Sequence, residues 1–435
     1  MSYTEVLQIV LLVLWGISSL AVLHYLFFTI LGIFKRKKFP KADKKLRYAI
    51  MVGARNEEAV IGKLIDSIKN SDYPADKLTV FVLAHNCTDK TADIARSHGA
   101  VVYEYDNPEE NTLGYAYKAL IAHINEDYGY RAFDGIFSVN ADNIISTDYF
   151  DLMNDAFVYY GAKNVVTSFR NSGNFNDNYM SSLYGMYFIS CCRYEMRGRT
   201  LCGCSTRISG TGYVFPSELI KDGWEYVTLT EDWEFSADQV AAGRKIYYCD
   251  QAEFFDEQPT TVKIMLRQRL RWARGHTIVF FTRFKKLVAS IFKPNKNMRS
   301  KERFSSYDLA VSIMPLGAIG LTMGFLTAVL VGLTPLIQDN GWEIVKNALI
   351  WFGGSFVVSY VLTALSGALI YFIERKRIPK GFWRHFAAIL LWPFFLLLTC
   401  FLDFISLFTK NLAWKSIPHK GSAALADENA NAKNA

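Results

Sequence analysis

The acidic run at residues 230–234 has the composition and the setting of a general base. It reads Thr-Glu-Asp-Trp-Glu and opens a stretch whose apolar residues recur with helical spacing, so it predicts the first turn of a helix. The helix dipole stabilises acids in a first turn, and Thr230 is a plausible N-cap, which explains the run without any chemistry. The same location keeps a carboxylate ionised, as a base that accepts a hydroxyl proton must be. Asp232, with Glu231 beside it, is therefore the candidate catalytic residue.

A second polar pair, Asn140 and Asp142, follows a short apolar run at 136–139. Carboxylate and amide oxygens are ligands for Mg²⁺ or Mn²⁺, and such a cation neutralises a departing diphosphate. Asn and Asp are also common turn formers. Taken alone, the pair is better explained as a turn, and a cation site needs support from other motifs.

The run Gln-Arg-Leu-Arg-Trp at 268–272 combines two kinds of ligand-binding side chain. Arginine forks bind phosphates, and the flat face of Trp272 suits a sugar ring. The surrounding segment, 261–280, also fits an amphipathic basic helix on a membrane surface, and the two interpretations are compatible. Upstream, Gly210 and Thr211 lie in a glycine-rich run that predicts either close approach to an acceptor or a turn.

Apolar runs of strand type alternate with stretches of helical periodicity in the first third of the chain. Strands are expected at 48–52, 78–83, 100–105 and 136–139, and helices at 57–70, 88–98 and 114–126. This alternation predicts an α/β fold, a Rossmann-like and mostly parallel sheet with helices on both faces. Ligands bind beyond the carboxyl ends of such strands. Polar clusters at 54–57, 85–89 and 140–143 follow three of these strands and form a candidate nucleotide site.

The chain also carries long apolar segments outside this α/β region. Of its 435 residues 51% are hydrophobic, and the stretches nearly free of charge are 7–34, 308–336, 346–373 and 386–409. Each exceeds the roughly 20 residues needed to span a bilayer. The basic flank at 35–45 and the basic loop at 375–384 predict a multi-pass protein of the cell membrane with its soluble domain in the cytosol.

The predicted division of the chain follows from this pattern. We expect an N-terminal transmembrane helix (1–35), a cytosolic α/β domain (44–260), interfacial basic helices (261–303), a C-terminal transmembrane block (304–412) and a disordered tail (421–435). The last apolar segment is not expected simply to cross, because both its flanks are basic and Pro393 and Asp403 interrupt it. The net charge of +7 is assigned to topology and lipid headgroups, and no nucleic-acid partner is expected.

Seven motifs in a fixed order resemble the membrane-bound branch of the inverting family 2 glycosyltransferases, which includes the poly-N-acetylglucosamine, hyaluronan and cellulose synthases. They are ARNEE at 54–58, NCTDKT at 86–91, the aspartate loop at 140–143, GTGYVF at 210–215, LTEDWE at 229–234, DEQPTT at 256–261 and QRLRW at 268–272. The resemblance covers over half of the chain. It implies a GT-A fold and transfer of a sugar from a nucleotide diphosphate donor, UDP-linked by expectation, to a growing polysaccharide.

The resemblance also implies a role for each matching residue. Asp232 would be the base, with Glu231 beside it, and Asp142 with Asn140 would hold Mg²⁺ or Mn²⁺. The expected donor-binding residues are Ala54, Arg55, Asn56, Glu57, His85, Asp89, Asn140 and Asp142. The expected acceptor- and diphosphate-binding residues are Gln268, Arg269, Arg271, Trp272, Gly210 and Thr211. Expected partners are the nucleotide sugar, a glycan or lipid-linked acceptor, membrane lipids and possible secretion-complex subunits.

Three positions depart from the family pattern in the donor half. His85 and Asn140 stand where aspartates are usual, and Leu113 stands where a lysine is usual. These departures leave two alternatives open. One is transfer of a single sugar to a lipid carrier, and the other is a non-catalytic partner subunit that has lost donor binding.

Overall fold

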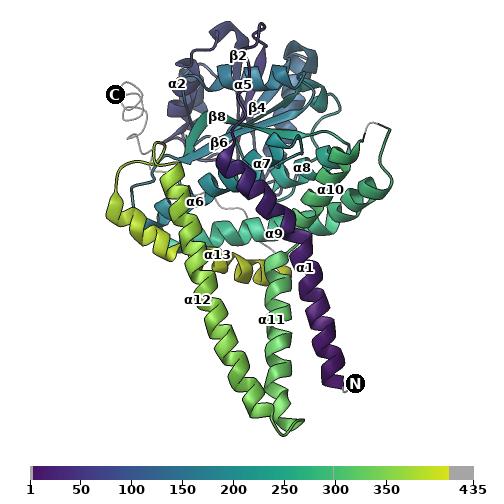
Figure 1. The fold of residues 1–435 in the computed structure, drawn as a ribbon. Coiled ribbons are helices and arrows are strands. Elements are labelled where there is room, and N and C mark those ends of the chain that lie inside the picture. Colours follow the sequence, from purple (N-terminus) through teal and green to yellow (C-terminus); the bar gives the residue numbers. More distant parts are fainter. Residues whose placement is uncertain (1–2, 297, 411–435) are drawn as a thin grey trace.

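One eight-stranded sheet organises the α/β part of the chain. The computed structural model describes residues 3–296 and 298–410, and its strands lie in the order β3-β2-β1-β4-β7-β6-β8-β5 (Figure 1). The strands are β1 Tyr48–Ala54, β2 Leu78–His85, β3 Val101–Tyr105, β4 Gly135–Ser138, β5 Ile144–Ile145, β6 Val165–Ser172, β7 Tyr213–Pro216 and β8 Ile246–Asp256. The four predicted strands correspond to β1 through β4.

Helices cover both faces of the sheet and continue beyond it. In the α/β part they are α2 Ile61–Lys69, α3 Thr91–Ser97, α4 Leu113–Asp127, α5 Tyr149–Tyr159, α6 Tyr179–Ser190, the π-helix η3 Cys191–Met196, α7 Arg197–Leu201 and α8 Glu231–Ala241. Short 3₁₀ turns are η1 Ala75–Lys77, η2 Tyr130–Ala132, η4 Ser217–Ile220 and η5 Thr334–Leu336. The remaining helices are α1 Tyr3–Phe34, α9 Val262–Phe292, α10 Ser300–Ile313, α11 Leu316–Leu333, α12 Gly341–Ile373 and α13 Phe382–Phe408.

Strand direction brings the polar clusters to one edge. β1 pairs in parallel with both β2 and β4, and β2 pairs in parallel with β3. β7 is antiparallel to β4 and β6, whereas β6 and β8 are parallel. The carboxyl ends of β1, β2 and β4 therefore meet at the same edge. The predicted mostly parallel α/β sheet is confirmed, and the insertion of antiparallel β7 is an addition that the sequence pattern did not predict.

Alternation of side chains along β1 builds a core on each face of the sheet. Ile50 and Val52 pack with α2 and α5, whereas Ala49 and Met51 pack with α4 and α8. All four side chains are fully buried. This two-sided burial explains the continuous apolar run, because both faces of a covered parallel strand lie in the core.

Three long helices leave the underside of the α/β domain. α1, α11 and α12 project away from the sheet, and α11 and α12 form a hairpin (Figure 1). Four helices of the described residues are long and apolar enough to cross a membrane, namely Leu12–Phe34, Leu316–Leu336, Gly341–Ile373 and Trp383–Phe408. The chain therefore has the composition of a membrane protein, as its sequence predicted.

The apolar stretch 308–336 is not a single segment, and the predicted span is corrected here. α10 ends at Ile313 and α11 begins at Leu316, because Pro315 has no backbone N–H to continue the helix and Met314 is extended. Asp308 belongs to α10 and forms ion pairs with Arg199 at 2.6 Å and with His24 of α1 at 2.7 Å. The first turns of the stretch thus anchor the domain rather than enter the apolar hairpin.

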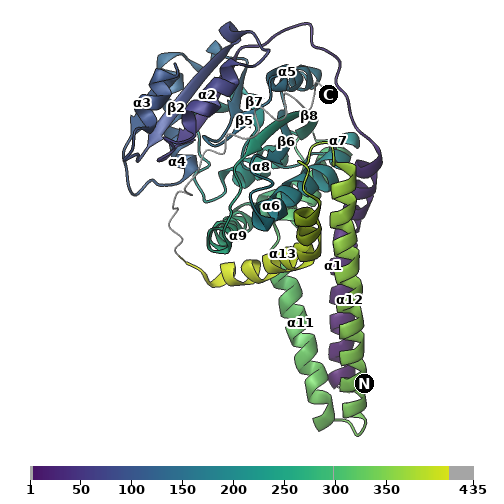
Figure 2. The ribbon, with the colours of Figure 1, turned by 90° about the vertical axis from the view of Figure 1, so that its left-hand side faces the viewer.

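The last apolar helix lies across the underside of the α/β domain. α13 runs beneath α9 and across the direction of α11 and α12 (Figure 2). Asp403 contacts the start of α11, where a Cβ on Gly317 would meet its Oδ2 at 2.7 Å. Thr277 of α9 hydrogen-bonds Ser406 at 2.8 Å. This orientation agrees with the prediction that the segment does not simply cross, which stays a prediction. The predicted disordered tail lies outside the described residues.

Candidate active site

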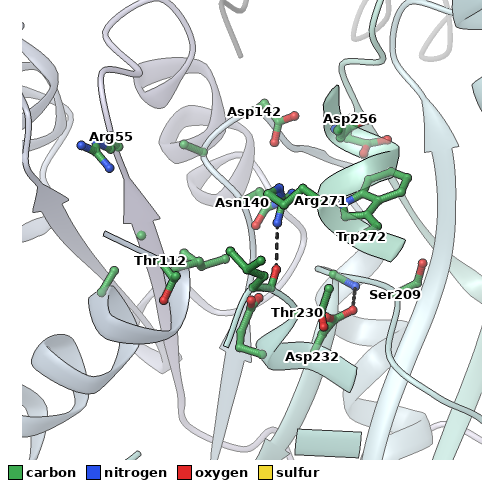
Figure 3. Close-up of a pocket in the computed structure, with 18 of the residues that line it drawn as sticks. Arg55, Thr112, Asn140, Asp142, Ser209, Thr230, Asp232, Asp256, Arg271 and Trp272 are labelled. Atoms are coloured by element: carbon green, nitrogen blue, oxygen red, sulfur yellow. Dashed lines mark hydrogen bonds between the residues drawn. The ribbon is translucent and has the colours of Figure 1, made fainter. Parts of the chain in front are cut away.

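One cavity of about 230 Å³ opens at the carboxyl edge of the sheet (Figure 3). Its walls come from the ends of β1, β2 and β4, the loop before β7, the start of α8 and one side of α9. The structure places most of the predicted site residues in its lining: Ala54, Arg55, Glu57, His85, Asn140, Asp142, Gly210, Glu231, Asp232, Gln268, Arg271 and Trp272. Residues more than 200 positions apart in the sequence thus line the same cavity.

Two residues predicted to bind the donor lie outside the lining and stabilise the strand-end loops instead. Asn56, at a positive φ of 57°, accepts a hydrogen bond from the Thr88 backbone N–H at 2.7 Å. Asp89 accepts hydrogen bonds from the backbone N–H groups of Thr91 at 3.0 Å and Glu58 at 3.2 Å. The Asp89–Thr91 bond holds the first residue of α3, and the other two bonds connect the loop after β1 to the loop before α3. Both side chains therefore stabilise these loops.

Thr211 also lies outside the lining and holds the loop after β4. Its hydroxyl donates to Asn143 Oδ1 at 2.7 Å and accepts from the Asn140 backbone N–H at 2.9 Å. Asn143 is fully buried and accepts from the same N–H at 3.0 Å. Thr211 therefore fixes the backbone that presents Asp142, rather than facing an acceptor.

Arg269 differs most from its predicted role. It is 5% exposed, and its guanidinium donates to the Phe395 carbonyl at 3.3 Å and to the Thr399 hydroxyl, both on α13. Arg271, two residues later on α9, points the other way into the cavity and donates to the Leu229 carbonyl at 2.9 Å (Figure 3). Successive helical residues are about 100° apart, so two positions place these two arginines on different faces.

The acid pair at the start of α8 is buried at the bottom of the cavity. Asp232 Oδ2 accepts a hydrogen bond from the Gly210 backbone N–H at 2.8 Å (Figure 3). Burial raises the pKa of Asp232, and the N–H groups of Gly210 and Trp233 oppose that rise. Burial and the adjacent Asp232 raise the pKa of Glu231. The arrangement gives one proton acceptor whose orientation is fixed by a backbone hydrogen bond.

The rest of the acidic run is structural. Thr230 occupies the N-cap position of α8, as predicted, but within the described residues its side chain makes no capping hydrogen bond. Glu234 pairs with Arg283 of α9 at 2.6 Å and accepts from the Thr228 backbone N–H at 3.3 Å. The third acid thus holds α8 against α9.

α9 supplies the aromatic and amide wall of the cavity. Trp272 packs edge-on against Tyr184 and Phe188, with ring centroids 6.2 and 6.0 Å apart. The side-chain oxygen of Gln268 is buried and has no hydrogen-bond partner among the described residues. An unsatisfied buried acceptor facing a cavity is a natural partner for a ligand hydroxyl.

Carboxylates gather at the opposite rim, near the ends of β1, β4 and β8. Burial, followed by repulsion from the nearby charge of Asp142, raises the pKa of Glu57 to about 9. Burial also raises the pKa of Asp256, Arg170 opposes the rise and Asp142 adds to it. Asp142 thus lies close enough to both acids to interact electrostatically, and these hard oxygen donors fit a divalent cation. No three His, Cys, Asp or Glu residues in the described ranges form a complete metal site on their own.

Two of the three departures from the family pattern, His85 and Leu113, have local explanations. His85 is 3% exposed, stacks on Tyr105 and lies 2.6 Å from the Glu110 carbonyl through Nε2. Its burial lowers its pKa, and this disfavours the charged imidazolium. Leu113 packs against Gly53, where an added Cβ would meet it at 2.5 Å. With His85 and Leu113 in these places, this end of the cavity carries fewer charged side chains than the family pattern would place there.

Several lining residues were not predicted as site residues. They are Asn111, Thr112, Arg170, Arg207, Asp256, Glu257, Gln258, Arg267 and His276, among others. Asp256, Glu257 and Gln258 belong to the DEQPTT motif at 256–261, so the sequence contained a signal for these three residues. Arg170 lies inside β6 without any flanking motif, and only the sheet order places it beside the cavity.

Gly275 is a specific test of the contact between α9 and the acidic run. A Cβ on Gly275 would meet Thr230 Cγ2 at 2.4 Å and Oγ1 at 2.6 Å, so Gly275→Ala must displace the Thr230 side chain at the start of α8 or the facing turn of α9. We expect kcat to fall about 100-fold, because small displacements of catalytic groups have effects of this order. Gly353→Ala is the control, since nothing lies within 4 Å of that position. Equal kcat values for both variants would contradict this account.

Comparison with known proteins places the chain in a family. A family model described as "Glycosyltransferase like family 2" matches residues 46–275. "Probable glycosyltransferase YdaM" of Bacillus subtilis is 26% identical over 273 residues, which make up 59% of this chain and 59% of that protein. "Beta-monoglucosyldiacylglycerol synthase" of Synechocystis is 47% identical over only 45 residues, 10% of this chain and 9% of that protein. The chain thus aligns with less than two thirds of either relative.

A solved structure supports the fold. The mannosyltransferase PcManGT from Pyrobaculum calidifontis, in complex with GDP-Man and Mn²⁺, is similar with a TM-score of 0.59 and 15% identity, over 85% of this chain and 98% of that chain. At this identity the similarity concerns the fold, which is GT-A with helices appended. The family model covers more than half of the chain, and its range contains the acidic run, the aspartate loop and the Gln-Arg-Leu-Arg-Trp run. The chain belongs to the family 2 glycosyltransferases.

Proposed function

We propose that this enzyme transfers a sugar, with inversion, from a nucleotide diphosphate sugar to an acceptor hydroxyl, with UDP-sugars as the first donors to test. One observation carries the proposal: Asp232, oriented by the Gly210 N–H, lies in the same cavity as Asp142 from the loop after β4 and Arg271 from α9. A base, a carboxylate that can hold a cation and a half-buried guanidinium are groups that direct displacement of a diphosphate requires.

The proposed chemistry assigns one task to each side of the cavity. Asp232 accepts the proton of the acceptor hydroxyl as that oxygen attacks the anomeric carbon from the face opposite the diphosphate, which inverts the configuration. Arg271 stabilises negative charge on the leaving side, and its partial burial strengthens that interaction. Trp272 offers an apolar face to a sugar ring, and Gln268 accepts a hydroxyl hydrogen bond.

A divalent cation is part of the proposal. Asp142 would hold Mg²⁺ or Mn²⁺, with Asn140 and the neighbouring acids as further oxygen donors. When bound, such a cation supplies charge neutralisation for the leaving diphosphate. The Pyrobaculum mannosyltransferase structure contains Mn²⁺ and GDP-Man, which supports a divalent cation and a nucleotide sugar for this fold.

The acceptor is proposed to be a growing polysaccharide at the cytosolic face of the membrane. The acceptor wall is α9, which lies on the membrane side of the domain next to α11 and α13 (Figure 2). The basic flanks at 35–45 and 375–384 support the cytosolic assignment. Anionic membrane lipids and secretion-complex subunits are proposed as further partners.

A lipid-linked acceptor is the second candidate. The short match to a Synechocystis protein named for a glucosyldiacylglycerol product favours it. So does α13, which crosses the underside of the domain where a polymer channel would begin (Figure 2). A non-catalytic subunit is less well supported, because the acid pair, Asp142 and Arg271 all line one cavity.

Product analysis tests the proposal. The purified full chain, in detergent or lipid nanodiscs, is incubated with a panel of UDP- and GDP-sugars and Mg²⁺ or Mn²⁺, with membrane lipids and oligosaccharides as acceptors. We expect one donor to give a ladder of products of inverted anomeric configuration. A single added sugar on a lipid, under excess donor, would establish the second candidate instead. Retained configuration would overturn direct displacement.

A further inference from the structure

Arg170 lies between two parts of the cavity that the sequence did not connect. Its side chain, on β6, is 12% exposed. Nε donates to Asp256 Oδ2 at 2.8 Å, Nη2 donates to the same oxygen, and Nη1 donates to the Ser209 carbonyl at 2.9 Å. The guanidinium carbon lies 3.5 Å from the centroid of the Phe188 ring. Each of the three guanidinium nitrogens therefore donates a hydrogen bond, and one face of the group packs on an aromatic ring.

The contact with Ser209 reaches the acid pair through one peptide. Gly210 follows Ser209, has a φ of +81° and donates its N–H to Asp232. A positive φ is strained for most residues but accessible to glycine, which has no Cβ. Nη1 of Arg170 lies 3.5 Å from the position of a Cβ on Gly210. The guanidinium is thus packed against the turn whose N–H orients the Asp232 carboxylate.

The contact with Asp256 reaches the carboxylate rim. Asp256 is 3% exposed and interacts electrostatically with Asp142. Its other oxygen accepts from Gln258 Nε2 at 2.5 Å. A buried carboxylate without a cationic partner is strongly unfavourable, so Asp256 holds Arg170 in place as much as the reverse.

We propose that Arg170 is a positioning residue: it fixes the Ser209–Gly210 turn and thereby the orientation in which Asp232 meets the acceptor hydroxyl. The inference rests on the proposed function, in which Asp232 is the base. Lysine cannot replace arginine here, because a single ammonium on a flexible stem does not reproduce a rigid fork that contacts Asp256 and Ser209 at once. Lysine would keep the positive charge beside Asp256 but lose the contact that fixes the turn next to Asp232. The substitution therefore separates the role of the charge from the role of the geometry.

Arg170→Lys tests this separation in the full chain. We expect the variant to fold, kcat to fall about 100-fold, as loss of orientation predicts, and the donor KM to change by less than about threefold. The Gly210 N–H lowers the pKa of Asp232, so a loosened turn raises that pKa and moves the acid limb of the kcat profile to higher pH. The charged and titratable groups that face Asp232 from the elements around it stay unaltered in the variant: Glu231, Arg271, Arg207, Tyr117 and Tyr213.

Arg193→Lys is the matched control. Arg193 is also a buried arginine in an ion pair, with Glu374 at 2.6 Å, but it does not line the cavity. It is expected to lower the thermal midpoint and to leave the acid limb unchanged. An unshifted acid limb in Arg170→Lys would assign Arg170 to stability alone, and a rise confined to donor KM would assign it to donor binding. Either result overturns the proposal.

A titration independent of turnover separates this inference from the proposed function. Infrared difference spectra of the Asp232 carboxylate, with Asp232→Asn as the reference, report its pKa without donor or acceptor. We expect that pKa to be higher in Arg170→Lys than in the unaltered chain. If no nucleotide sugar is turned over but this shift appears, the proposed function fails and the positioning contact stands. If the shift is missing, the positioning contact fails whatever the activity.

Discussion

Asp232→Asn is expected to lower kcat about 10³-fold, within the range by which a general base accelerates a reaction. An amide is nearly the same size as the carboxylate but does not accept a proton at neutral pH. The Gly210 N–H can still donate to the amide oxygen, so the turn should keep its conformation. Donor binding, measured by calorimetry with a nucleoside diphosphate, should change less than about twofold, because the residues proposed to bind the donor and Asp232 lie on different walls of the cavity.

The pH profile provides an independent measure of the same residue. Asp232 must be ionised to accept a proton, and burial raises its pKa. Activity should therefore fall as pH falls through that raised pKa, and the acid limb should lie above about 3.9, the ordinary value for aspartate. Glu231→Gln is the matched control and removes only the neighbouring charge. Near-normal turnover in Asp232→Asn with loss in Glu231→Gln would make Glu231 the base.

Asp142→Ala is expected to abolish detectable turnover and cation-dependent donor binding. Asn140 is a neutral ligand and its backbone N–H is held by Thr211 and Asn143, so Asp142 is the charged group that its loop can offer. Calorimetry of Mn²⁺ with and without a nucleoside diphosphate should show weak binding alone and tight binding together, because phosphate oxygens complete the coordination. Asp76→Ala, on an exposed turn, is the control.

Asn140→Asp is the complementary variant. A second carboxylate should tighten Mn²⁺ binding in the absence of nucleotide by about tenfold, since ligand charge sets affinity for hard cations. The same charge opposes release of the diphosphate and should slow turnover. Tight Mn²⁺ binding by the unaltered chain without nucleotide, or full activity in a strong chelator, would contradict this account and leave charge neutralisation to Arg271 and its neighbours.

Patterns of neighbouring residues were sufficient to predict those features that depend on neighbouring residues alone. The apolar runs of β1 to β4 predicted strands because a doubly covered strand is buried on both faces, and α3 ends just before Gly99, whose φ of +79° suits a helix terminus. The polar clusters after these strands predicted the cavity edge, since parallel strands end together. The boundaries shifted by a few residues because Asn56, Asp89 and their neighbours form loops before the helices begin.

The family resemblance extended these predictions to the acidic run, the aspartate loop and the Gln-Arg-Leu-Arg-Trp run, and the family model confirms the membership. It did not separate residues that face the ligand from those that hold the loops. Asn56, Asp89 and Thr211 hydrogen-bond backbone N–H groups of the loops, and a motif contains both kinds of residue because both are needed for the same geometry.

What the sequence by itself determined is therefore the class of the fold, the long apolar helices and the chemistry of the side chains in the motifs. Only the tertiary structure decided which way each side chain of α9 points: Arg271 into the cavity and Arg269 into α13. Only the sheet order brought Arg170 of β6 beside Asp256 of β8 and the turn that orients Asp232. The reason is physical. Strand and helix formation depends on neighbours in sequence, whereas the partner of a buried charge is whichever opposite charge the packing of distant elements brings within reach.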